Sequence, residues 1–272
     1  TPLYSSAASD VYKRQGYDNI DIRAATEKGI VVCNNPEFIK SEVADHALAL
    51  ILSLVRKLHR VTESTRTGEW SWRKLRPIYS LDGKTAGIIG FGNIGKQVAK
   101  RLRAFDMSVL VYDPHVPAET IERLGAKPAS LEDLLRDCEI VTVHVPLTEE
   151  TRGLLGKNHL SMMRSSAILV NTSRGAVIDQ DALLECLRSG RIAAAGLDVL
   201  AKEPPDPDEP IFALDNVIVS PHVAWYSEES SLRLQEYAAL EAERILRGQV
   251  PKHPVNAEVL GPTRHLDRSR HG

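Results

Sequence analysis

The chain has 272 residues, a net charge of −2 at pH 7 and a hydrophobic content of 43%. This length accommodates one or two domains with a sizeable core, and the near-neutral charge excludes recruitment by nucleic acid or by a membrane surface through bulk charge. The three cysteines, Cys33, Cys138 and Cys186, are widely separated, which predicts buried, reduced thiols in a cytoplasmic protein and neither a disulfide nor a metal site.

The two ends of the chain lack the pattern of folded structure. Residues 5–15 (SSAASDVYKRQ) show no periodicity and resemble the translation of a sequencing-library adaptor, so residues 1–15 are predicted to be non-native or disordered. In that case the native N-terminal part is missing. Residues 261–272 are predicted to form a disordered tail. Residues 16–35 suggest a helical turn and a strand at 30–33, like the last unit of a domain whose earlier strands are absent.

Residues 36–68 carry a long helical pattern with one broad apolar face, and Gly68 is its expected stop. The most apolar part, residues 43–55, includes Asp45 and His46 and is too short and too polar to cross a bilayer. Such a long face either packs on the protein's own sheet or forms part of a subunit interface, and the pattern does not decide between them.

A glycine motif follows a short apolar strand pattern at residues 85–89 and leads into a helical pattern. Gly90 allows a tight turn, Gly92 lets the backbone approach a ligand, and Gly95 lets the helix pack close to the strand. The free N–H groups at the helix start then face an anion. The residues expected to hold a dinucleotide pyrophosphate are Gly90, Gly92, Asn93, Ile94 and Gly95.

The segment after this helix decides between two interpretations of the glycine motif, a nucleotide site and a flexible loop. Residues 108–112 (SVLVY) predict a second strand that ends at Asp113, about twenty residues beyond the glycines, where an acid meets the adenosine ribose hydroxyls. No Arg or Lys stands beside Asp113. Because a carboxylate repels a 2′-phosphate, the pattern favours NAD over NADP.

The rest of the chain alternates strand and helix patterns. Ser130 begins a helix as its N-cap. Further strands are predicted at residues 139–145, 167–171, 192–199 and 216–220, and helices at 158–163, 179–189 and 227–247. With the first two, these six strands and their intervening helices predict an α/β fold with a doubly wound parallel sheet.

Three strand ends on this sheet carry residues suited to catalysis. Arg174 offers a planar, permanently charged fork for a carboxylate, and His222 exchanges a proton near neutral pH. Glu203 is placed to pair with His222 and to hold its tautomer. Each residue alone is commonplace. Together, at the edge where ligands bind such sheets, they predict a catalytic site.

The motifs GFGNIGK, DPH, HVPLT, LVNTSRGAVID, GLDVL and SPHVAW together resemble the D-isomer-specific 2-hydroxyacid dehydrogenases. The closest branch contains the C-terminal binding proteins and the phosphoglycerate dehydrogenases. The resemblance implies a Rossmann NAD-binding domain at residues 36–225. Residues 16–35 and 226–260 would then be parts of a flavodoxin-like substrate domain. It also implies a homodimer joined through the NAD-binding domains.

The resemblance further implies an NAD-dependent oxidoreductase that transfers a hydride between NAD(H) and a D-2-hydroxy acid or 2-oxo acid. Arg174 would anchor the substrate carboxylate, His222 would be the acid or base, and Glu203 would stabilise its imidazolium. The cofactor cleft would be lined by Pro146, Thr172, Asp198 and His222, with Asp198 on the nicotinamide carboxamide.

Two questions stay open at this point. Trp225 is expected either to reach into the substrate pocket, which would favour an apolar or larger 2-oxo acid, or to pack in the core. The C-terminal binding protein branch includes corepressors, so the alternative to an enzyme is an interaction protein that senses NAD(H) and whose hydride chemistry is incidental. The sequence does not name the 2-hydroxy acid, although Glu203 disfavours formate because formate dehydrogenases have Gln there.

Overall fold

The computed structural model of the chain describes residues 16–17, 20–36 and 39–260. The chain divides into two compact units. The smaller unit contains the residues up to Lys40 and those from Trp225 onward, and the larger unit is Ser41–Ala224. The sequence analysis places these boundaries at residues 36 and 225. The segments 1–15 and 261–272, expected to be disordered, lie outside the described residues.

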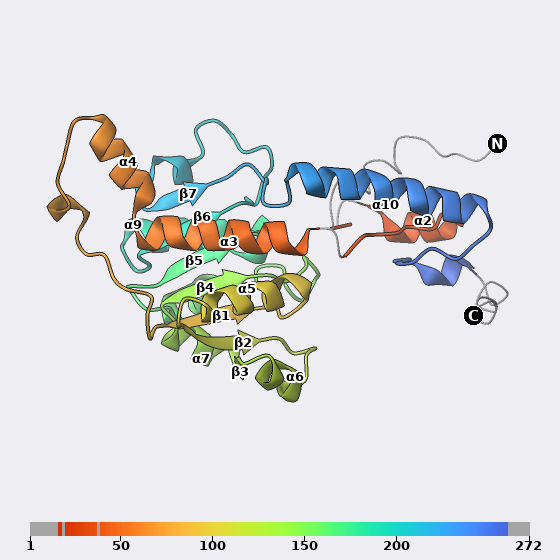
Figure 1. Cartoon of the computed structure of the whole chain (residues 1–272), viewed down its shortest axis with the longest axis horizontal. Helices are drawn as coiled ribbons and strands as arrows, with labels where there is room; N and C mark the ends of the chain where they lie inside the picture. Colours follow the sequence, from red (N-terminus) through yellow and green to blue (C-terminus); the bar gives the residue numbers. More distant parts are fainter. Residues whose placement is uncertain (1–15, 18–19, 37–38, 261–272) are drawn as a thin grey trace. The chain divides into compact units, whose positions relative to one another are not determined.

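The larger unit is built on a seven-stranded parallel sheet (Figure 1). Its strand order is β3-β2-β1-β4-β5-β6-β7, so the direction of winding reverses between β1 and β4. The predicted doubly wound parallel sheet is therefore confirmed. Its strands are β1 (Thr85–Ile89), β2 (Ser108–Tyr112), β3 (Lys127–Pro128), β4 (Ile140–Val143), β5 (Ile168–Asn171), β6 (Ala194–Leu197) and β7 (Val217–Val219).

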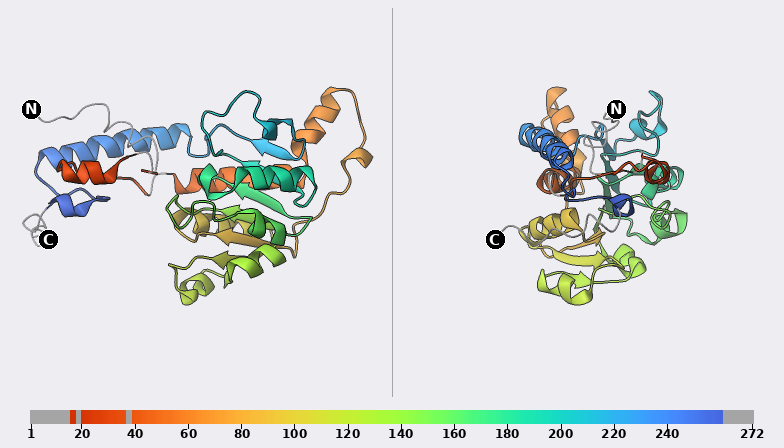
Figure 2. Two further views of the ribbon diagram at one scale, coloured as in Figure 1. Left: turned by 180° about the vertical axis from the view of Figure 1, so that it is seen from behind. Right: turned by 90° about the vertical axis from the view of Figure 1, so that its right-hand side faces the viewer.

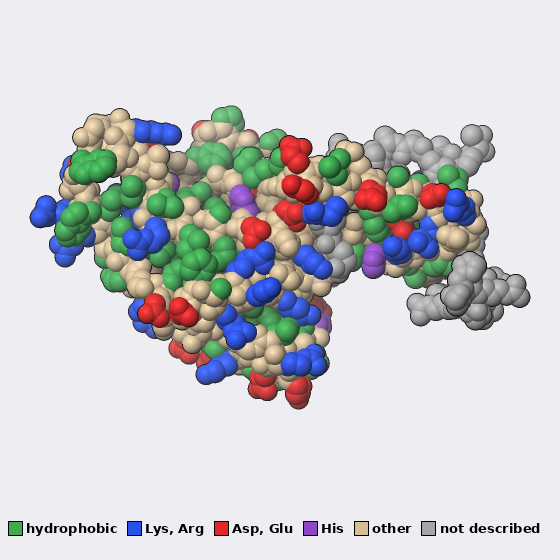
Figure 3. Space-filling model, viewed as in Figure 1, with side chains coloured by type: hydrophobic (Ala, Val, Ile, Leu, Met, Phe, Trp, Pro, Cys, Tyr) green, Lys and Arg blue, Asp and Glu red, His purple; other side chains and the backbone are tan. Residues whose placement is uncertain are grey.

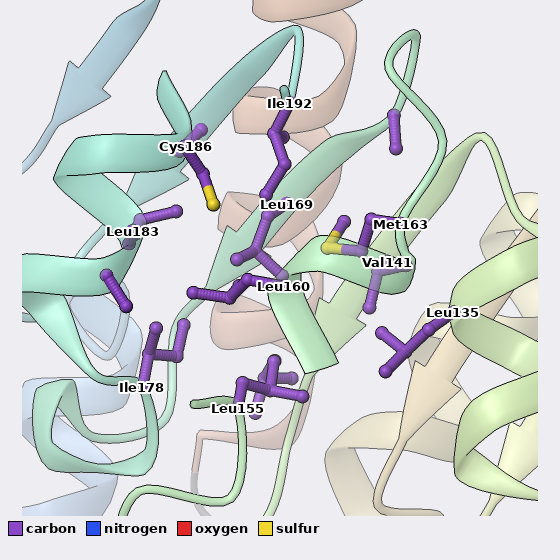
Figure 4. Close-up of a cluster of buried hydrophobic side chains, with 14 of the residues drawn as sticks. Leu135, Val141, Leu155, Leu160, Met163, Leu169, Ile178, Leu183, Cys186 and Ile192 are labelled. Atoms are coloured by element: carbon purple, nitrogen blue, oxygen red, sulfur yellow. The ribbon is translucent and has the colours of Figure 1, made fainter. Parts of the chain in front are cut away.

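Helices cover both faces of this sheet (Figure 2). They are α3 (Lys40–Val55), α4 (Leu58–Arg66), α5 (Asn93–Arg103), α6 (Ala118–Arg123), α7 (Leu131–Asp137), α8 (Lys157–Met162) and α9 (Gln180–Arg188), with 3-10 turns η1 (Arg73–Leu75), η2 (Gly175–Val177) and η3 (Pro210–Ala213). Helices α3 and α5 pack on one face against a cluster that includes Ile88 and Val170. The other face packs against α7, α8 and α9 around Leu160 and Leu169 (Figure 4). Both faces of the central strands are buried, as parallel sheets require.

Local capping explains where several helices begin. The Ser130 hydroxyl accepts a hydrogen bond from the Asp133 N–H at 3.1 Å, which confirms the predicted N-cap of α7. The Asp179 carboxylate accepts from the Ala182 N–H at 3.1 Å and caps α9 in the same way. These side chains satisfy amide groups that the first turn of a helix leaves without a partner.

The single long helix predicted for residues 36–68 is wrong. Helix α3 ends at Val55, and α4 starts at Leu58 after Lys57, which adopts a left-handed backbone conformation (φ +52°). The physical reason is packing. Helix α3 buries seven side chains against the sheet, and α4 buries none, so the support for one straight helix ends with α3.

The sequence analysis also misses α6 and β3. Strand β3 has two residues, Lys127 and Pro128, and both are exposed. It pairs with β2 at the edge of the sheet, where no apolar alternation is needed. The sheet therefore has seven strands and not the six expected.

The smaller unit contains α2 (Ile22–Glu27), α10 (Glu228–Leu246) and a 3-10 turn, η4 (Ala257–Leu260). Helix α10 confirms the helix predicted at residues 227–247 and begins at Ser227 as its N-cap. The strand predicted at residues 30–33 is wrong, because Cys33 makes only an isolated antiparallel bridge with Pro254. A strand needs a partner that offers a ladder of bonds, and the described part of this unit supplies one bridge.

Candidate functional site

The glycine turn after β1 has the geometry of a phosphate-binding loop. Gly90 has φ +94°, and a Cβ there would lie 2.7 Å from the carbonyl oxygen of His144, so only glycine fits. A Cβ on Gly95 would overlap the Gly90 carbonyl, which is why α5 can pack so close to β1. Gly92 caps α5 and faces open space. The N-terminus of α5 is thus free for an anion to approach.

Asp113, at the end of β2, is fixed beside this turn. Its Oδ2 accepts from the Phe91 N–H at 2.7 Å, and its Oδ1 accepts from the His115 N–H at 2.9 Å. Phe91 lies between the first two glycines of the motif. A carboxylate offers about four lone-pair positions, so Asp113 keeps acceptor capacity for two ribose hydroxyls.

Two buried polar atoms lie at the ends of β4 and β5, next to the reversal of winding. Neither the Oγ1 of Thr172 nor the Nδ1 of His144 has a hydrogen-bond partner among the described residues. The register pairs Val143 with Asn171, so the next residues, His144 and Thr172, follow on neighbouring strands. Buried polar atoms normally have partners. Their position beside the glycine turn fits a bound dinucleotide that supplies them.

Glu203 and His222 form the contact that the sequence analysis expects. Glu203 Oε2 lies 2.6 Å from His222 Nδ1, and the side chains are 28% and 18% exposed. An ionised carboxylate has no proton to donate, so Nδ1 carries the hydrogen and Nε2 carries the lone pair. Glu203 Oε1 accepts from the Leu200 N–H at 3.0 Å, which fixes the carboxylate itself. The pair therefore presents one imidazole nitrogen ready to take a proton.

The loop that bears Arg174 is packed against the segment that bears Glu203. Arg174 stands just before η2, and its Nη1 donates to the Ser173 carbonyl at 2.7 Å. A Cβ on the next residue, Gly175, would overlap the backbone of Leu200. Since the Leu200 N–H also holds Glu203, the same short segment after β6 positions both loops.

Asp198, at the end of β6, holds the turn that carries His222. Its carboxylate is 1% exposed. Oδ1 accepts from the Ser220 hydroxyl at 2.6 Å and from the Val223 N–H at 2.9 Å, and Oδ2 accepts from the Ala224 N–H at 2.9 Å. The structure thus shows Asp198 as the anchor of the His222 turn, and its contact with the nicotinamide carboxamide stays a prediction.

Comparison with known proteins decides the family. Residues 48–224 match the family model described as D-isomer specific 2-hydroxyacid dehydrogenase, NAD binding domain. The chain belongs to this family. Its larger unit is the NAD-binding domain, and the glycine turn, Asp113 and the two buried polar atoms are fit for that cofactor.

Individual members of the dehydrogenase family are similar over most of the chain. D-3-phosphoglycerate dehydrogenase of Archaeoglobus fulgidus is 43% identical over 248 residues, which cover 91% of this chain and 47% of the relative. Glyoxylate reductase of Korarchaeum cryptofilum is 42% identical over 248 residues, 90% of this chain and 75% of the relative. The chain therefore spans about half the length of the first of these relatives.

Solved structures of the family have the same fold. D-lactate dehydrogenase of Aquifex aeolicus, complexed with NAD and lactic acid, superposes with a TM-score of 0.85 at 32% identity and covers 92% of this chain and 79% of its own. These named relatives are dehydrogenases and reductases. The alternative of an NAD(H)-sensing interaction protein receives no support from them.

Two further residues of the predicted site, Pro146 and Trp225, take no part in the hydrogen bonds described above. Pro146 is exposed after β4, with its carbonyl accepting from the Thr151 hydroxyl at 2.5 Å. Trp225 belongs to the smaller unit, where its ring packs edge to face on Tyr226. Sequence reasoning missed His144 and His46, which lie at the carboxyl end of β4 and on α3. Only the HVPLT motif pointed to the first, and nothing local pointed to the second.

No helix in the described ranges has the length and hydropathy needed to span a membrane. Within the same ranges, no three His, Cys, Asp or Glu side chains are arranged to hold a metal ion. Burial raises the pKa of the Cys33 thiol to about 11 and that of Cys138 to about 12, so both stay protonated near neutral pH.

The half-buried His144 ring leads to a prediction about the stability of the fold in acid. Burial lowers the pKa of His144 to about 3, and its Nε2 lies 2.9 Å from the Thr142 hydroxyl. In the unfolded chain the pKa returns to about 6.5. Between these values the unfolded chain binds the extra proton, so the free energy of unfolding falls as the pH drops from about 6.5 toward 3.

We expect His144→Gln to flatten this decline, measured by urea denaturation between pH 4 and pH 7.5. His115→Gln is the matched control, because His115 is exposed and should leave the slope nearly unchanged. Equal slopes for wild type and His144→Gln would contradict the assignment.

Proposed function

We propose that this chain provides the catalytic and cofactor-binding part of an NAD-dependent D-2-hydroxyacid dehydrogenase, which interconverts a D-2-hydroxy acid and a 2-oxo acid. The observation that carries the proposal is the 2.6 Å contact between Glu203 and His222 at the carboxyl edge of an NAD-binding sheet. Such a carboxylate–imidazole pair is the acid–base device that oxidation of an alcohol needs.

The residues divide the work of the reaction. In oxidation, His222 Nε2 takes the proton from the substrate hydroxyl while the hydride leaves C2. In reduction, the imidazolium returns that proton to the carbonyl oxygen. Glu203 keeps the hydrogen on Nδ1 and stabilises the imidazolium. Arg174 binds the substrate carboxylate through its planar fork and polarises the 2-oxygen. When bound, NAD accepts or supplies the hydride at its nicotinamide ring.

The remaining predicted site residues hold the cofactor in this proposal. The amide groups at Gly92, Asn93 and Ile94 face the pyrophosphate, and Asp113 binds the adenosine ribose. Thr172 and His144 supply the two buried polar atoms that lack partners among the described residues. Pro146 and Asp198 flank the nicotinamide. Trp225 is proposed as a residue of the substrate pocket.

We further propose a homodimer formed through an arm of the NAD-binding domain, and a cytoplasmic location consistent with three free, buried thiols. The arm is defined as residues 58–79, which include α4 and η1 (Figure 1). It carries Trp70, Trp72 and Tyr79, which are 92%, 63% and 61% exposed. Figure 3 shows hydrophobic side chains gathered on this arm, at the left of the view. Large aromatic side chains are rarely left in water unless a partner covers them.

Replacing His222 by Asn tests the acid–base role. His222 has φ +54°, and Asn tolerates this conformation, so the turn should survive the change. We expect kcat to fall by about 10²- to 10⁴-fold, the usual contribution of general acid–base catalysis, while the Kd for NADH stays unchanged. NADH oxidation is followed with a panel of 2-oxo acids, and His159→Asn on α8 is the control.

Turnover that survives in His222→Asn would exclude the assigned role. Wild-type protein that binds NADH but oxidises it with no acid of the panel would favour the NAD(H)-sensing alternative.

Asp113→Ser tests the choice of cofactor. Serine lacks the charge that binds ribose hydroxyls and repels a 2′-phosphate, and its hydroxyl lies one bond closer to the backbone than the Asp113 oxygens. A hydrogen bond to a charged group contributes about 1.5–3 kcal/mol, so we expect the Kd for NADH to rise on the order of tenfold or more. The ratio of the Kd for NADPH to the Kd for NADH should decrease. Fluorescence titration with both nucleotides measures this, with the exposed Asp137→Ser as control.

The double variant Trp70→Glu/Trp72→Glu tests the dimer. Because both side chains are exposed, replacing them by glutamate should not disturb the fold of the domain. The two carboxylates should oppose burial of this surface between two copies of the chain. We expect sedimentation to show a dimer for wild type and a monomer for the variant. Phe105→Glu, at a side chain that is 41% exposed and lies outside the arm, should leave the dimer intact. A wild-type monomer would refute this part of the proposal.

A further inference from the structure

Helix α3 places one histidine against the anchor of the catalytic turn. His46 Nε2 lies 2.9 Å from Ser220 Oγ and 3.5 Å from Asp198 Oδ1. The His46 side chain is 25% exposed, and the Asp198 carboxylate is 1% exposed. All three residues belong to the larger unit. His46 therefore extends the Asp198 network away from the catalytic residues, to a helix on the face of the sheet.

Counting protons gives the direction of these hydrogen bonds. The Ser220 hydroxyl has one proton, and its oxygen lies 2.6 Å from Asp198 Oδ1, a length typical of a hydroxyl that donates to a carboxylate. With its proton given to Asp198, Ser220 Oγ can only accept from His46. His46 Nε2 must therefore carry a hydrogen. The order of donation is His46 to Ser220 to Asp198.

The backbone carbonyls of the same two residues, Asp198 and Ser220, hold the backbone of His222. The His222 N–H lies 2.9 Å from the Asp198 carbonyl and 3.0 Å from the Ser220 carbonyl. The Asp198 carboxylate receives the next two N–H groups of the turn, from Val223 and Ala224. A rotation of the Ser220 or Asp198 side chain would thus change the position of the turn that presents the imidazole.

We propose that His46 is a positioning residue for His222, acting through Ser220 and Asp198. This inference rests on the proposed function, because it assigns His46 a task in proton transfer at His222. Because His46 donates to the Ser220 oxygen, the Ser220 hydroxyl proton can only be donated to Asp198. This hydrogen bond keeps the Asp198 carboxylate oriented toward the amides of Val223 and Ala224. Without that donor, Ser220 is free to rotate and Asp198 loses a directed partner.

The hydrogen bonds of His46, Ser220 and Asp198 lie close in sequence to the points where the chain enters and leaves the larger unit. The chain enters the larger unit at Ser41, five residues before His46, and leaves it at Ala224, two residues after His222. The hydrogen bonds from His46 to Ser220 and from the Ala224 N–H to Asp198 therefore connect the segment where the chain enters the NAD-binding domain with the segment where it leaves. His46 thereby holds the catalytic turn in place at the point where the chain leaves that domain.

The first test reads the tautomer of His46 directly and does not depend on turnover. Imidazole ¹⁵N chemical shifts distinguish a hydrogen on Nε2 from one on Nδ1. We expect wild-type His46 to carry its hydrogen on Nε2 and Ser220→Ala to disturb that signal. A hydrogen on Nδ1 alone in wild type would overturn the proposal. If the protein proved inactive with every 2-oxo acid, the proposed function would fail, but this measurement would still judge the hydrogen-bond order.

The second test separates positioning from simple packing. His46→Gln keeps an N–H donor at nearly the same reach, and His46→Leu keeps bulk without the donor. We expect His46→Leu to lower kcat about tenfold, the effect of one lost hydrogen bond. The Kd for NADH should not change, and the His222 imidazole resonance should broaden. His46→Gln should restore both readouts toward wild type.

His59→Leu is the matched control, because His59 also bonds through Nε2, to the Asp215 carbonyl at 3.2 Å, but not to this network. Should His46→Leu fail to fold, His46→Ala, which also lacks the donor, replaces it in a double-mutant cycle with Ser220→Ala. Each single variant should lower kcat, and adding His46→Ala to Ser220→Ala should have no further effect. Additive losses, or equal kcat in His46→Leu and wild type, would show that His46 merely packs.

Discussion

The buried carboxylate of Asp198 is the interaction on which the catalytic edge of this protein depends. A carboxylate withdrawn from water is costly unless hydrogen bonds replace its hydration, and here a hydroxyl and two backbone amides do so. The residue also joins its neighbours through its backbone, since its N–H donates to the Asn171 carbonyl at 2.9 Å. One residue, through its backbone and its side chain, thereby links the ends of β5, β6 and β7.

The sheet explains why polar atoms gather at this edge and not elsewhere. Parallel strands send their carboxyl ends to one side, and the strands themselves are filled by apolar side chains on both faces. Polar groups therefore collect mainly at and after the last residue of each strand. Asp113, His144, Thr172 and Asp198 each follow a strand in this way. The two whose polar atoms lack partners within the described ranges follow β4 and β5, on one side of the point where the winding reverses, which is where a dinucleotide binds such sheets.

The parts of the fold that the sequence predicts are those with a local signal. Strands of apolar residues and helices with a Ser or Asp cap fall where the pattern puts them. Strand β3 has no such pattern, because its two residues are exposed. The break between α3 and α4 carries no Gly or Pro, since Lys57 itself takes the left-handed conformation. Its cause lies in which turns of the helix contact the sheet, and residue spacing does not contain that information.

The site shows the same division between local and distant signals. The contact between Glu203 and His222 is predictable, because both follow strands that end at one edge of the sheet. His46 is not, because its partner Ser220 lies 174 residues away. The hydrogen bond forms only because the packing of α3 on the sheet brings His46 next to Ser220, which follows β7. A histidine on an apolar helix face therefore looks structural until the helix is placed.

The conformation of His222 shows why so many groups converge on one turn. A residue other than glycine pays about 1–2 kcal/mol for φ +54°, yet glycine cannot transfer a proton. The turn must therefore be held by its surroundings against a preference for another conformation. Asp198 meets this need because its two oxygens accept from two successive amides. Asparagine would present an NH₂ group to one of those amides, and that donor would be left facing a donor. The charge at Asp198 is thus required by the shape of the turn as much as by the chemistry of the imidazole.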